Sequence, residues 1–406
     1  MRILQLAPLM ERVPPVAYGG IEVVVYDLVE ELLRRGHEVT LFASGDSFTS
    51  ARLRSIFPRS LRTNYKEFTC PDFVAWSHVA QALKEAKGFD IIHNHTGELA
   101  MVMSQFVKTP MLTTFHGPHL PEHEFIFRQY KGYFNTISAA GKRGYPDKGF
   151  VGVVYNSIDV GSFPYCADKD DYLLFLSRIS PEKGTHTAVE VAMRLGQKLI
   201  IAGKVDRVDE EYYRREIEPR IDGKLVQYVG EADGKLKREL YAKAQCLLLP
   251  ITWNEPFGLV MAEAMACGTP VIAFGYGSAP ELVVHGKTGY IVTDLEEMVA
   301  AARKVNRIDP RECREHIAEH FDVPKMADGY LAAYESILKE EASVAPSKAQ
   351  SQPTVSLPAS IPSFLLTEHD SQHSCPMCAL TAGLDQTPSI SPIAQTVPTQ
   401  DLLRAV

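Results

Sequence analysis

Residues 246–274 read CLLLPITWNEPFGLVMAEAMACGTPVIAF and predict a strand, a helix and a second strand in succession. The first five residues form an apolar run that a proline stops, which is typical of a buried parallel strand. From Gly258 onward the side chains favour a helix of about three turns, and Gly268 suits the position just past its end. The second strand is expected at residues 270–274. The unit predicts an open α/β sheet, with a polar loop beyond the carboxyl end of a strand.

Two glutamates flank the turn that opens this helix. Glu255 lies in the preceding loop, and Glu263 lies one to two turns inside the helix. The first amides of a helix lack intrahelical partners and lie at the positive end of its dipole, so the turn Phe257, Gly258, Leu259 can hold an anion such as a diphosphate. The two acids can then face a sugar on one side and a ribose on the other. The alternative is that both are ordinary acids that compensate the helix dipole.

The composition limits the class of protein. A chain of 406 residues with 45% hydrophobic residues can bury two cores, so two domains are expected. The net charge of −8 argues against a nucleic-acid partner. The first residues begin a strand rather than a signal peptide, and no apolar run is long enough to span a bilayer, so membrane contact is peripheral at most. The seven scattered cysteines suit reduced thiols in a cytoplasmic protein.

The last part of the chain changes in character. From residue 342 onward it is rich in Ser, Pro, Ala, Gln and Thr, which predicts a disordered tail. Cys375 and Cys378 form a single Cys-x-x-Cys pair there, and His369 and His373 lie near it. A closed zinc site needs four ligands, and one pair is weak evidence for it, so no metal site is predicted.

The first half alternates apolar runs with helix-like segments, as a parallel sheet covered on both faces does. A helix is expected at residues 22–35, after the pair Gly19 and Gly20. The pair lets amides face a phosphate, but it lacks the Gly-x-Gly-x-x-Gly spacing of a dinucleotide site, so no redox cofactor is predicted. A flexible connector is the alternative. The expected strands are residues 3–6, 39–43, 90–93, 111–115, 135–138 and 151–155.

Three histidines follow strands of this half. His93 and His95 come at the end of one strand, and His116 ends the next. Ligands collect beyond the carboxyl ends of parallel strands, so these positions face the expected cleft. We expect His93 and His95 to point to opposite faces, which disfavours a shared metal. His116 is the stronger functional candidate, with a satisfied loop histidine as the alternative.

Two charged segments carry weaker signals. Asp168 and Asp170 resemble the Asp-x-Asp pair of metal-dependent glycosyltransferases, but they lie in a connector at residues 160–171 and coincidence is the better interpretation. The other segment is basic and predicts a solvated loop, with contact to an anionic acceptor or a membrane surface as the alternative. It contains Arg52, Arg54, Arg59, Arg62 and Lys66.

The second half repeats the alternation, with strands expected at residues 172–176, 198–203, 225–230 and 246–250. After the first of them, Arg178 and Lys183 bracket Pro181, which suits the first turn of a helix. Two cations and free amides would then converge there, which suits a diphosphate. The alternative is a plain surface, where an Arg and a Lys five residues apart are common. Turns are expected at residues 279–283 and 285–290, and a terminal helix at residues 326–337.

These motifs together resemble those of the retaining GT-B glycosyltransferases, in particular glycosyltransferase family 4. The resemblance covers residues 1–340 and rests on Glu255-(x)7-Glu263 with its Pro-Phe-Gly, and on Arg178-x4-Lys183-Gly. It implies an α/β GT-B fold of two Rossmann-like domains whose parallel sheets face a central cleft. The implied parts are an acceptor domain at 1–160, a donor domain at 161–322, a helix returning to the first domain at 323–341, and the tail at 342–406.

The resemblance also implies roles for single residues. Glu255 and His116 contact the donor sugar, Glu263 binds the ribose, and the amides of Phe257, Gly258 and Leu259 hold the diphosphate. Arg178 and Lys183 neutralise that diphosphate. The loop of Gly19 and Gly20 approaches the donor phosphate, and Val229 and Glu231 reach the nucleobase, largely through main-chain groups.

The implied function is a retaining hexosyltransferase. No carboxylate is evidently placed as a nucleophile behind the sugar, which favours front-face transfer. Because cationic side chains replace magnesium, no metal or other cofactor is predicted. The donor is a nucleotide sugar, with UDP-glucose preferred over GDP-mannose and UDP-N-acetylglucosamine, and the acceptor is a small molecule, glycan or lipid. A sugar-nucleotide-binding protein without activity, an epimerase and a phosphorylase are the alternatives on the same scaffold.

Overall fold

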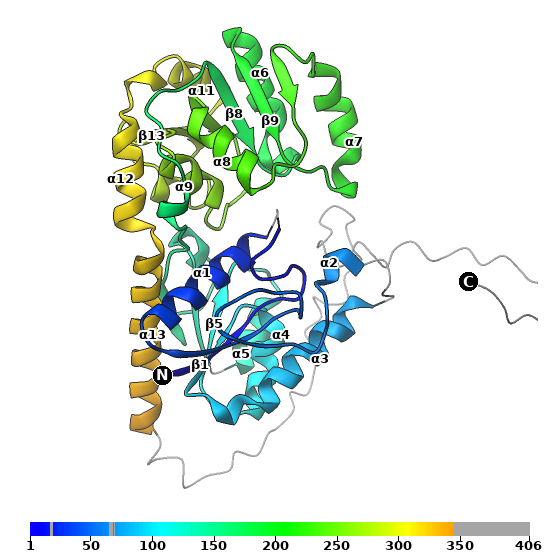
Figure 1. Cartoon of the computed structure of the whole chain (residues 1–406), viewed down its shortest axis with the longest axis vertical. Coiled ribbons are helices and arrows are strands. Elements are labelled where there is room, and N and C mark those ends of the chain that lie inside the picture. Colours follow the sequence, from blue (N-terminus) through cyan, green and yellow to red (C-terminus); the bar gives the residue numbers. More distant parts are fainter. Residues whose placement is uncertain (17–18, 65–67, 69, 131, 345–406) are drawn as a thin grey trace, which may run out of the picture. The chain divides into compact units, whose positions relative to one another are not determined.

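A computed structural model describes residues 1–344 except 17–18, 65–67, 69 and 131. The described residues lie in one compact unit (Figure 1). The predicted tail, with Cys375, Cys378, His369 and His373, lies outside the described residues, as does Lys66. In the part of the chain that the structure describes, no helix is long and apolar enough to cross a membrane.

The first half forms a parallel sheet of seven strands in the order β3-β2-β1-β4-β5-β6-β7. The strands follow the apolar runs expected from the sequence, with β6 two residues earlier than predicted. β3 was not predicted, because three residues at a sheet edge are too short to show a period. The strands are β1 (Arg2–Leu6), β2 (Glu38–Phe42), β3 (Arg52–Arg54), β4 (Ile91–Asn94), β5 (Met111–Phe115), β6 (Tyr133–Thr136) and β7 (Phe150–Val153).

The second half forms a parallel sheet of six strands in the order β10-β9-β8-β11-β12-β13. The predicted turns at residues 279–283 and 285–290 were wrong in part, because a short helix lies in the first and β13 begins in the second. β13 begins with a glycine directly after a polar turn, so its short apolar stretch does not stand out in the sequence. The strands are β8 (Tyr172–Leu176), β9 (Lys198–Ala202), β10 (Val226–Tyr228), β11 (Cys246–Leu249), β12 (Val271–Phe274) and β13 (Gly289–Val292).

Helices lie in most of the connections between strands, as is usual for parallel pairing, whereas β2 and β3 are joined by a loop. Helix α9 has eight residues, about one turn fewer than expected. The helices named by α labels are α1 (Gly20–Arg34), α2 (Leu61–Asn64), α3 (Pro71–Lys84), α4 (Glu98–Met103), α5 (His123–Gln129), α6 (Thr185–Leu195), α7 (Glu210–Tyr212), α8 (Gly234–Lys243), α9 (Leu259–Ala266), α10 (Ala279–Leu282), α11 (Leu295–Ala302), α12 (Pro310–His320) and α13 (Val323–Val344).

The terminal helix α13 is longer than predicted and packs beside α1 on the first sheet (Figure 1). Its buried face joins the apolar core between α1 and strands β1 and β2. Tyr330 and Tyr334 on this face are fully buried. The last described helix therefore belongs to the core of the first sheet. The proposed domain boundaries at residues 160 and 322 stay predictions.

Candidate active site beyond the strand ends

A cavity of about 540 Å³ lies beyond the carboxyl ends of strands from both sheets. Both strand orders reverse direction at the middle, between β1 and β4 and between β8 and β11, and open α/β sheets bind ligands at such a point. The cavity brings together most of the residues singled out in the sequence. The predicted residues among its lining are Gly19, Gly20, His116, Arg178, Lys183, Glu231, Glu255, Phe257, Gly258, Leu259 and Glu263.

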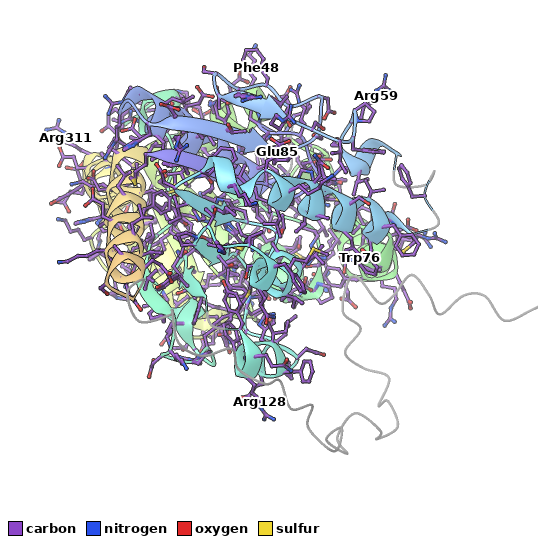
Figure 2. All side chains as sticks on the ribbon, turned by 90° about the horizontal axis from the view of Figure 1, so that it is seen from below. Phe48, Arg59, Trp76, Glu85, Arg128 and Arg311 are labelled. Atoms are coloured by element: carbon purple, nitrogen blue, oxygen red, sulfur yellow. The ribbon has the colours of Figure 1, made fainter. Side chains whose placement is uncertain are left out.

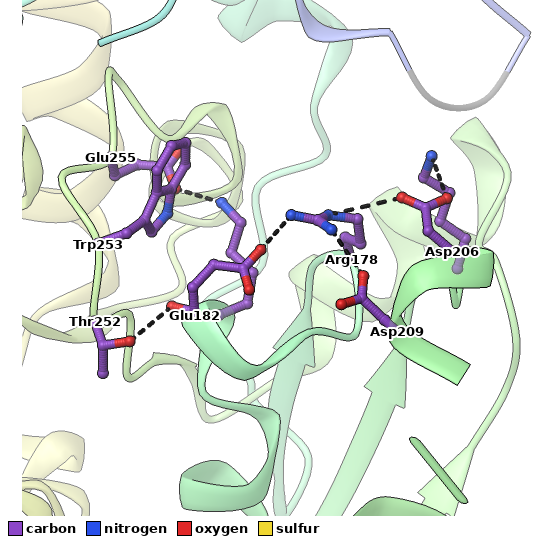
Figure 3. Close-up of polar contacts among 9 residues, drawn as sticks. Arg178, Glu182, Asp206, Asp209, Thr252, Trp253 and Glu255 are labelled. Atoms are coloured by element: carbon purple, nitrogen blue, oxygen red, sulfur yellow. Dashed lines mark hydrogen bonds and ion pairs between the residues drawn. The ribbon is translucent and has the colours of Figure 1, made fainter. Parts of the chain in front are cut away.

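Lys183 and Glu255 meet in this cavity, although 72 residues separate them. The ammonium of Lys183 lies 2.5 Å from a carboxylate oxygen of Glu255. The indole N–H of Trp253 donates to the same oxygen at 2.9 Å, and the Lys183 ammonium lies 4.6 Å from the centre of the indole ring. Trp253 therefore fixes both members of the pair (Figure 3). No pattern in the sequence predicted a role for this tryptophan.

Hydrogen bonds from the residue before α10 hold the main chain of the loop that carries Glu255. The amide of Ser278 donates to the Glu255 carbonyl at 2.9 Å, and its hydroxyl donates to the Phe257 carbonyl at 2.7 Å. Gly277 lies so close that a Cβ there would come within 2.3 Å of the Glu255 backbone. The loop is thus held through its main chain, which leaves the Glu255 carboxylate for the cavity.

Gly258 forms the turn that opens α9. Its φ of 76° is left-handed, and a Cβ on it would meet the Met261 methyl at 2.5 Å and Glu255 Cγ at 3.2 Å. Only glycine suits this position. Helix α9 begins at Leu259, so the first amides after the turn lack intrahelical partners and carry the positive end of the dipole. This arrangement can bind an anion.

Arg178 lies in the same cavity and is held by carboxylates (Figure 3). It donates to Asp209 at 2.8 Å, pairs with Glu182, and lies 3.8 Å from Asp206. Asp206 also pairs with Lys204, another cation of the cavity wall, at 3.0 Å. The two predicted cations, Arg178 and Lys183, both line the cavity. Ion pairs with carboxylates fix the orientation of their side chains.

Glu263 is buried on α9, and both of its carboxylate oxygens accept hydrogen bonds. Lys237 donates to one at 2.6 Å, and the Tyr241 hydroxyl donates to the other at 2.9 Å. Lys237 lines the cavity too, and the sequence analysis missed it. Nothing in the sequence marks a lysine of a polar helix as the partner of an acid 26 residues away.

Gly20 of the glycine pair in the first half lies close to Leu259, the first residue of α9. A Cβ on Gly20 would lie 3.2 Å from a methyl of Leu259, so only a small residue permits this approach. Glu22, in the first turn of α1, also lines the cavity and is 5% exposed. Burial raises the pKa of Glu22 to about 7. No motif in the sequence predicted a role for Glu22.

His116 lines the cavity from the end of β5. Its Nε2 lies 2.9 Å from Nδ1 of His95, and its Nδ1 is buried and finds no hydrogen-bond partner among the described residues. The expectation that His93 and His95 point to opposite faces was wrong, because residues two apart on a strand share a face. Their rings lie 4.0 Å apart. Within the described ranges no group of three or more His, Cys, Asp or Glu could hold a metal.

The last two predicted site residues, Val229 and Glu231, lie in the loop after β10. Glu231 lines the cavity, whereas Val229 does not. The amide of Val229 donates to the Ile201 carbonyl at 3.0 Å, and the carbonyl of Gly230 accepts from the Gly203 amide. These main-chain groups are used by the sheet. Contact between Val229 and a nucleobase stays a prediction.

The two charged segments have local partners. In the basic segment, Arg54 pairs with Glu85, Arg62 pairs with Glu11 and lines the cavity, and Arg59 projects from the surface (Figure 2). In the connector, Asp170 lies 4.0 Å from Lys243. Neither Asp168 nor Asp170 lines the cavity, in line with coincidence as the interpretation of that pair.

Comparison with known proteins gives two family matches and many relatives. The family described as Glycosyl transferases group 1 matches residues 165–319, and Glycosyltransferase Family 4 matches residues 18–145. A glycogen synthase of Mycobacterium tuberculosis is 26% identical over 408 residues, covering 82% of this chain and 95% of the relative.

Two solved structures resemble the fold. The sucrose-phosphate synthase of Thermosynechococcus elongatus has a TM-score of 0.69 at 20% identity, covering 84% of this chain and 99% of that one. HepE of Anabaena, solved in complex with UDP and glucose, has a TM-score of 0.64 at 20% identity, covering 83% of this chain and 100% of that one. At these identities the likeness shows a shared two-sheet architecture.

Proposed function

This chain belongs to glycosyltransferase family 4, the glycosyl transferases group 1 with the GT-B fold, and on that premise we propose that it transfers glucose from UDP-glucose to an acceptor. The contact between Lys183 and Glu255 at the start of α9 carries the proposal. A cation, a carboxylate and free helix amides meet there within one cavity. The cation and the amides suit a diphosphate, and the carboxylate suits the hydroxyls of its sugar.

In the proposed complex, Lys183 and the amides at the start of α9 bind the diphosphate, and Arg178 contributes from the neighbouring loop. Hydrogen bonds between charged groups are about twice as strong as neutral ones, and Lys183 is only 14% exposed, so water screens it little. Glu255 then accepts from sugar hydroxyls, and Glu263, already held by Lys237 and Tyr241, keeps one face for the ribose.

The chemical step proposed for this site is front-face transfer with retention. Negative charge develops on the departing diphosphate, and preorganised donors aimed at that charge supply most of the acceleration. Glu255 and Glu263 are each engaged by two donors, which favours binding roles over attack on the anomeric carbon. The leaving phosphate takes the proton of the acceptor hydroxyl in this scheme, so no enzyme base is assigned.

The proposal needs neither a divalent metal nor another cofactor. Lys183, Arg178 and Lys204 line the cavity, each beside a carboxylate partner, and in the proposed complex they bind the diphosphate in place of the metal that other transferases use. We also propose a cytoplasmic enzyme without a nucleic-acid partner. The five described cysteines are unpaired, which suits a reducing compartment.

UDP-glucose is the first donor to test, because a structure of similar fold holds UDP and glucose. GDP-mannose and UDP-N-acetylglucosamine are the next candidates. The acceptor is a small molecule, glycan or lipid that enters beside Met10, Glu11 and Arg62, which line the first-half side of the cavity.

The test is to incubate the protein with each donor alone and then with a mixture of acceptors, and to follow nucleoside diphosphate release and the sugar product. Transfer of glucose from UDP-glucose with retained configuration supports the proposal. An isomerised donor without acceptor, or phosphate-dependent cleavage of a product, identifies an epimerase or a phosphorylase instead. Transfer from GDP-mannose alone overturns the choice of donor.

A further inference from the structure

A continuous chain of buried hydrogen bonds runs behind His116 to the terminal helix. Each consecutive pair of side chains lies between 2.6 and 3.1 Å apart. All members except His116 are at most 3% exposed. Water therefore does not interrupt the chain, and the order of its members is Asn135, Thr114, His93, Tyr334, Gln5, His95 and His116.

The direction of the chain is set at the Asn135 end. The side-chain amide of Asn135 donates to the main-chain carbonyl of Thr136 at 3.3 Å, so its oxygen faces Thr114. That oxygen can only accept, and therefore the Thr114 hydroxyl donates to it at 2.7 Å. With its proton used, the Thr114 oxygen accepts from Nε2–H of His93, which lies 2.7 Å away.

The same direction continues through the next three members. Burial lowers the pKa of His93 and His95 well below the usual value, so each ring is neutral at pH 7 and carries a single N–H. The N–H of His93 donates to Thr114, and Nδ1 of His93 accepts from the Tyr334 hydroxyl at 2.6 Å. The Tyr334 oxygen accepts in turn from the side-chain amide of Gln5 at 3.1 Å.

The last links determine the state of His116. The side-chain carbonyl of Gln5 accepts from Nε2–H of His95 at 2.9 Å, which leaves Nδ1 of His95 to accept from Nε2–H of His116. Burial lowers the pKa of His116 to about 4, so its Nδ1 carries no proton at neutral pH. This atom is buried and has no partner among the described residues, and folded proteins rarely leave such an atom without a donor.

We infer that helix α13 fixes His116 as the Nε2–H tautomer through this chain, so that its Nδ1 accepts a hydrogen bond from a hydroxyl of the bound ligand. Tyr334, Gln5 and His95 are positioning residues that act through His116. His116 cannot then give a proton to the leaving group at neutral pH, because its one N–H is held by His95. The identification of that hydroxyl as part of a nucleotide sugar rests on the proposed function, whereas the tautomer does not.

The chain contains a matched pair of variants for the test. Tyr330 and Tyr334 lie one turn apart on α13, are both fully buried, and stack with ring centres 6.2 Å apart. The Tyr330 hydroxyl lies 3.2 Å from the Thr114 hydroxyl but does not join two members of the hydrogen-bond chain. The Tyr334 hydroxyl is itself a member of that chain. Tyr334→Phe interrupts the chain, and Tyr330→Phe removes an equivalent hydroxyl without interrupting it.

The measurement is ¹⁵N NMR of histidine-labelled full-length protein at pH 7 without substrate, with the His116→Gln variant used to assign the ring. We expect a protonated Nε2 and an unprotonated Nδ1 for His116 in the wild type and in Tyr330→Phe. In Tyr334→Phe, His116 should populate both tautomers. A protonated Nδ1 in the wild type, or the same tautomer in both variants, would overturn the inference.

A kinetic readout separates this inference from the proposed function. If the protein transfers glucose, kcat/KM for the donor should fall about tenfold in Tyr334→Phe, as for one lost hydrogen bond, and less than about twofold in Tyr330→Phe. Equal losses in the two variants would contradict the positioning role even if transfer occurs. If no sugar is transferred, the proposed function fails, and the NMR result still decides the tautomer.

Discussion

The ammonium of Lys183 lies 2.5 Å from the carboxylate of Glu255, and the side chain of Trp253 contacts both groups. Lys183 follows β8 and Glu255 follows β11, two strands that pair in the middle of the second sheet. Adjacent strands therefore bring the cation and the acid together at the place where the strand order reverses.

Lys183→Ala should lower turnover by about 10²-fold or more, the cost seen when one donor to a developing oxyanion is lost. The variant also leaves the Glu255 carboxylate, 13% exposed, without its cation. Steady-state rates measure the loss. Lys235→Ala is the control, because the Lys235 side chain is 86% exposed. Equal rates in the two variants would remove Lys183 from the diphosphate site.

Trp253→Phe keeps an aromatic ring near Lys183 and removes the N–H that donates to Glu255. A lost hydrogen bond costs about 1 kcal/mol, so donor affinity should fall about fivefold. Since the chain has two tryptophans, Trp76→Phe leaves Trp253 as the single reporter, and its fluorescence should change when UDP is added. Trp76 is 47% exposed and lies in α3, so Trp76→Phe should keep wild-type affinity. If Trp253 fluorescence does not change when UDP is added, the nucleotide binds elsewhere.

Gly258→Ala should weaken donor binding because a Cβ would collide with Met261 and Glu255. Gly286→Ala is a matched control: Gly286 has a φ of 80° and no atom within 4 Å of an added Cβ. Both variants carry the left-handed backbone cost of about 1–2 kcal/mol, which thermal unfolding measures. Only Gly258→Ala should also raise the Kd for UDP. Equal UDP affinities would mean that the turn does not touch the diphosphate.

Glu22→Gln should change how stability depends on pH. The pKa of Glu22 is about 7 in the folded protein and 4.5 in its reference state, so the folded state binds more protons between these values. Stability therefore falls as pH rises from 4.5 to about 7, by on the order of 3 kcal/mol for a buried group. The variant lacks this loss. In urea unfolding, the free energy of unfolding of Glu22→Gln relative to that of the wild type should increase between pH 4.5 and 7. Above pH 7 the difference between the two should be constant.

Glu211→Gln is the control for that experiment, because the Glu211 side chain is 83% exposed. It should follow the wild-type pH profile throughout. A difference between Glu22→Gln and the wild type that does not change with pH would mean that the Glu22 carboxyl titrates normally.

Turnover should not depend on a divalent metal, because Lys183, Arg178 and Lys204 already provide cations around the cavity. The measurement compares initial rates before and after exhaustive treatment with EDTA. The two rates should agree. A loss of activity that magnesium or manganese restores would contradict the proposed metal independence.

Local patterns in the sequence predicted much of the architecture. Long apolar runs such as residues 172–176 and 246–249 are buried on both faces of the sheet, and their composition shows it. The edge strand β3 is three residues long, and β13 starts with a glycine, so neither shows a period that sequence analysis can detect. The positions near the diphosphate turn were predictable because the turn, helix and glycine are neighbours in the chain.

Contacts between distant segments were not predictable in this way. Lys237 meets Glu263 only after α8 and α9 pack together, and Tyr334 reaches His93 across 241 positions of sequence. The prediction that His93 and His95 point to opposite faces was wrong for another reason. Side chains alternate along a strand, so residues two apart point to the same face. A correct period would have placed both rings on one face, as the structure does.

We propose that Lys183 and the start of α9 hold the diphosphate of a nucleotide sugar, and a crystal structure of the protein soaked with UDP would show whether they do. Phosphate oxygens should lie within hydrogen-bond distance of the Lys183 ammonium and of the amides of Leu259 and Val260. A UDP molecule bound away from these groups, or a cavity that stays empty at saturating UDP, would contradict this proposal.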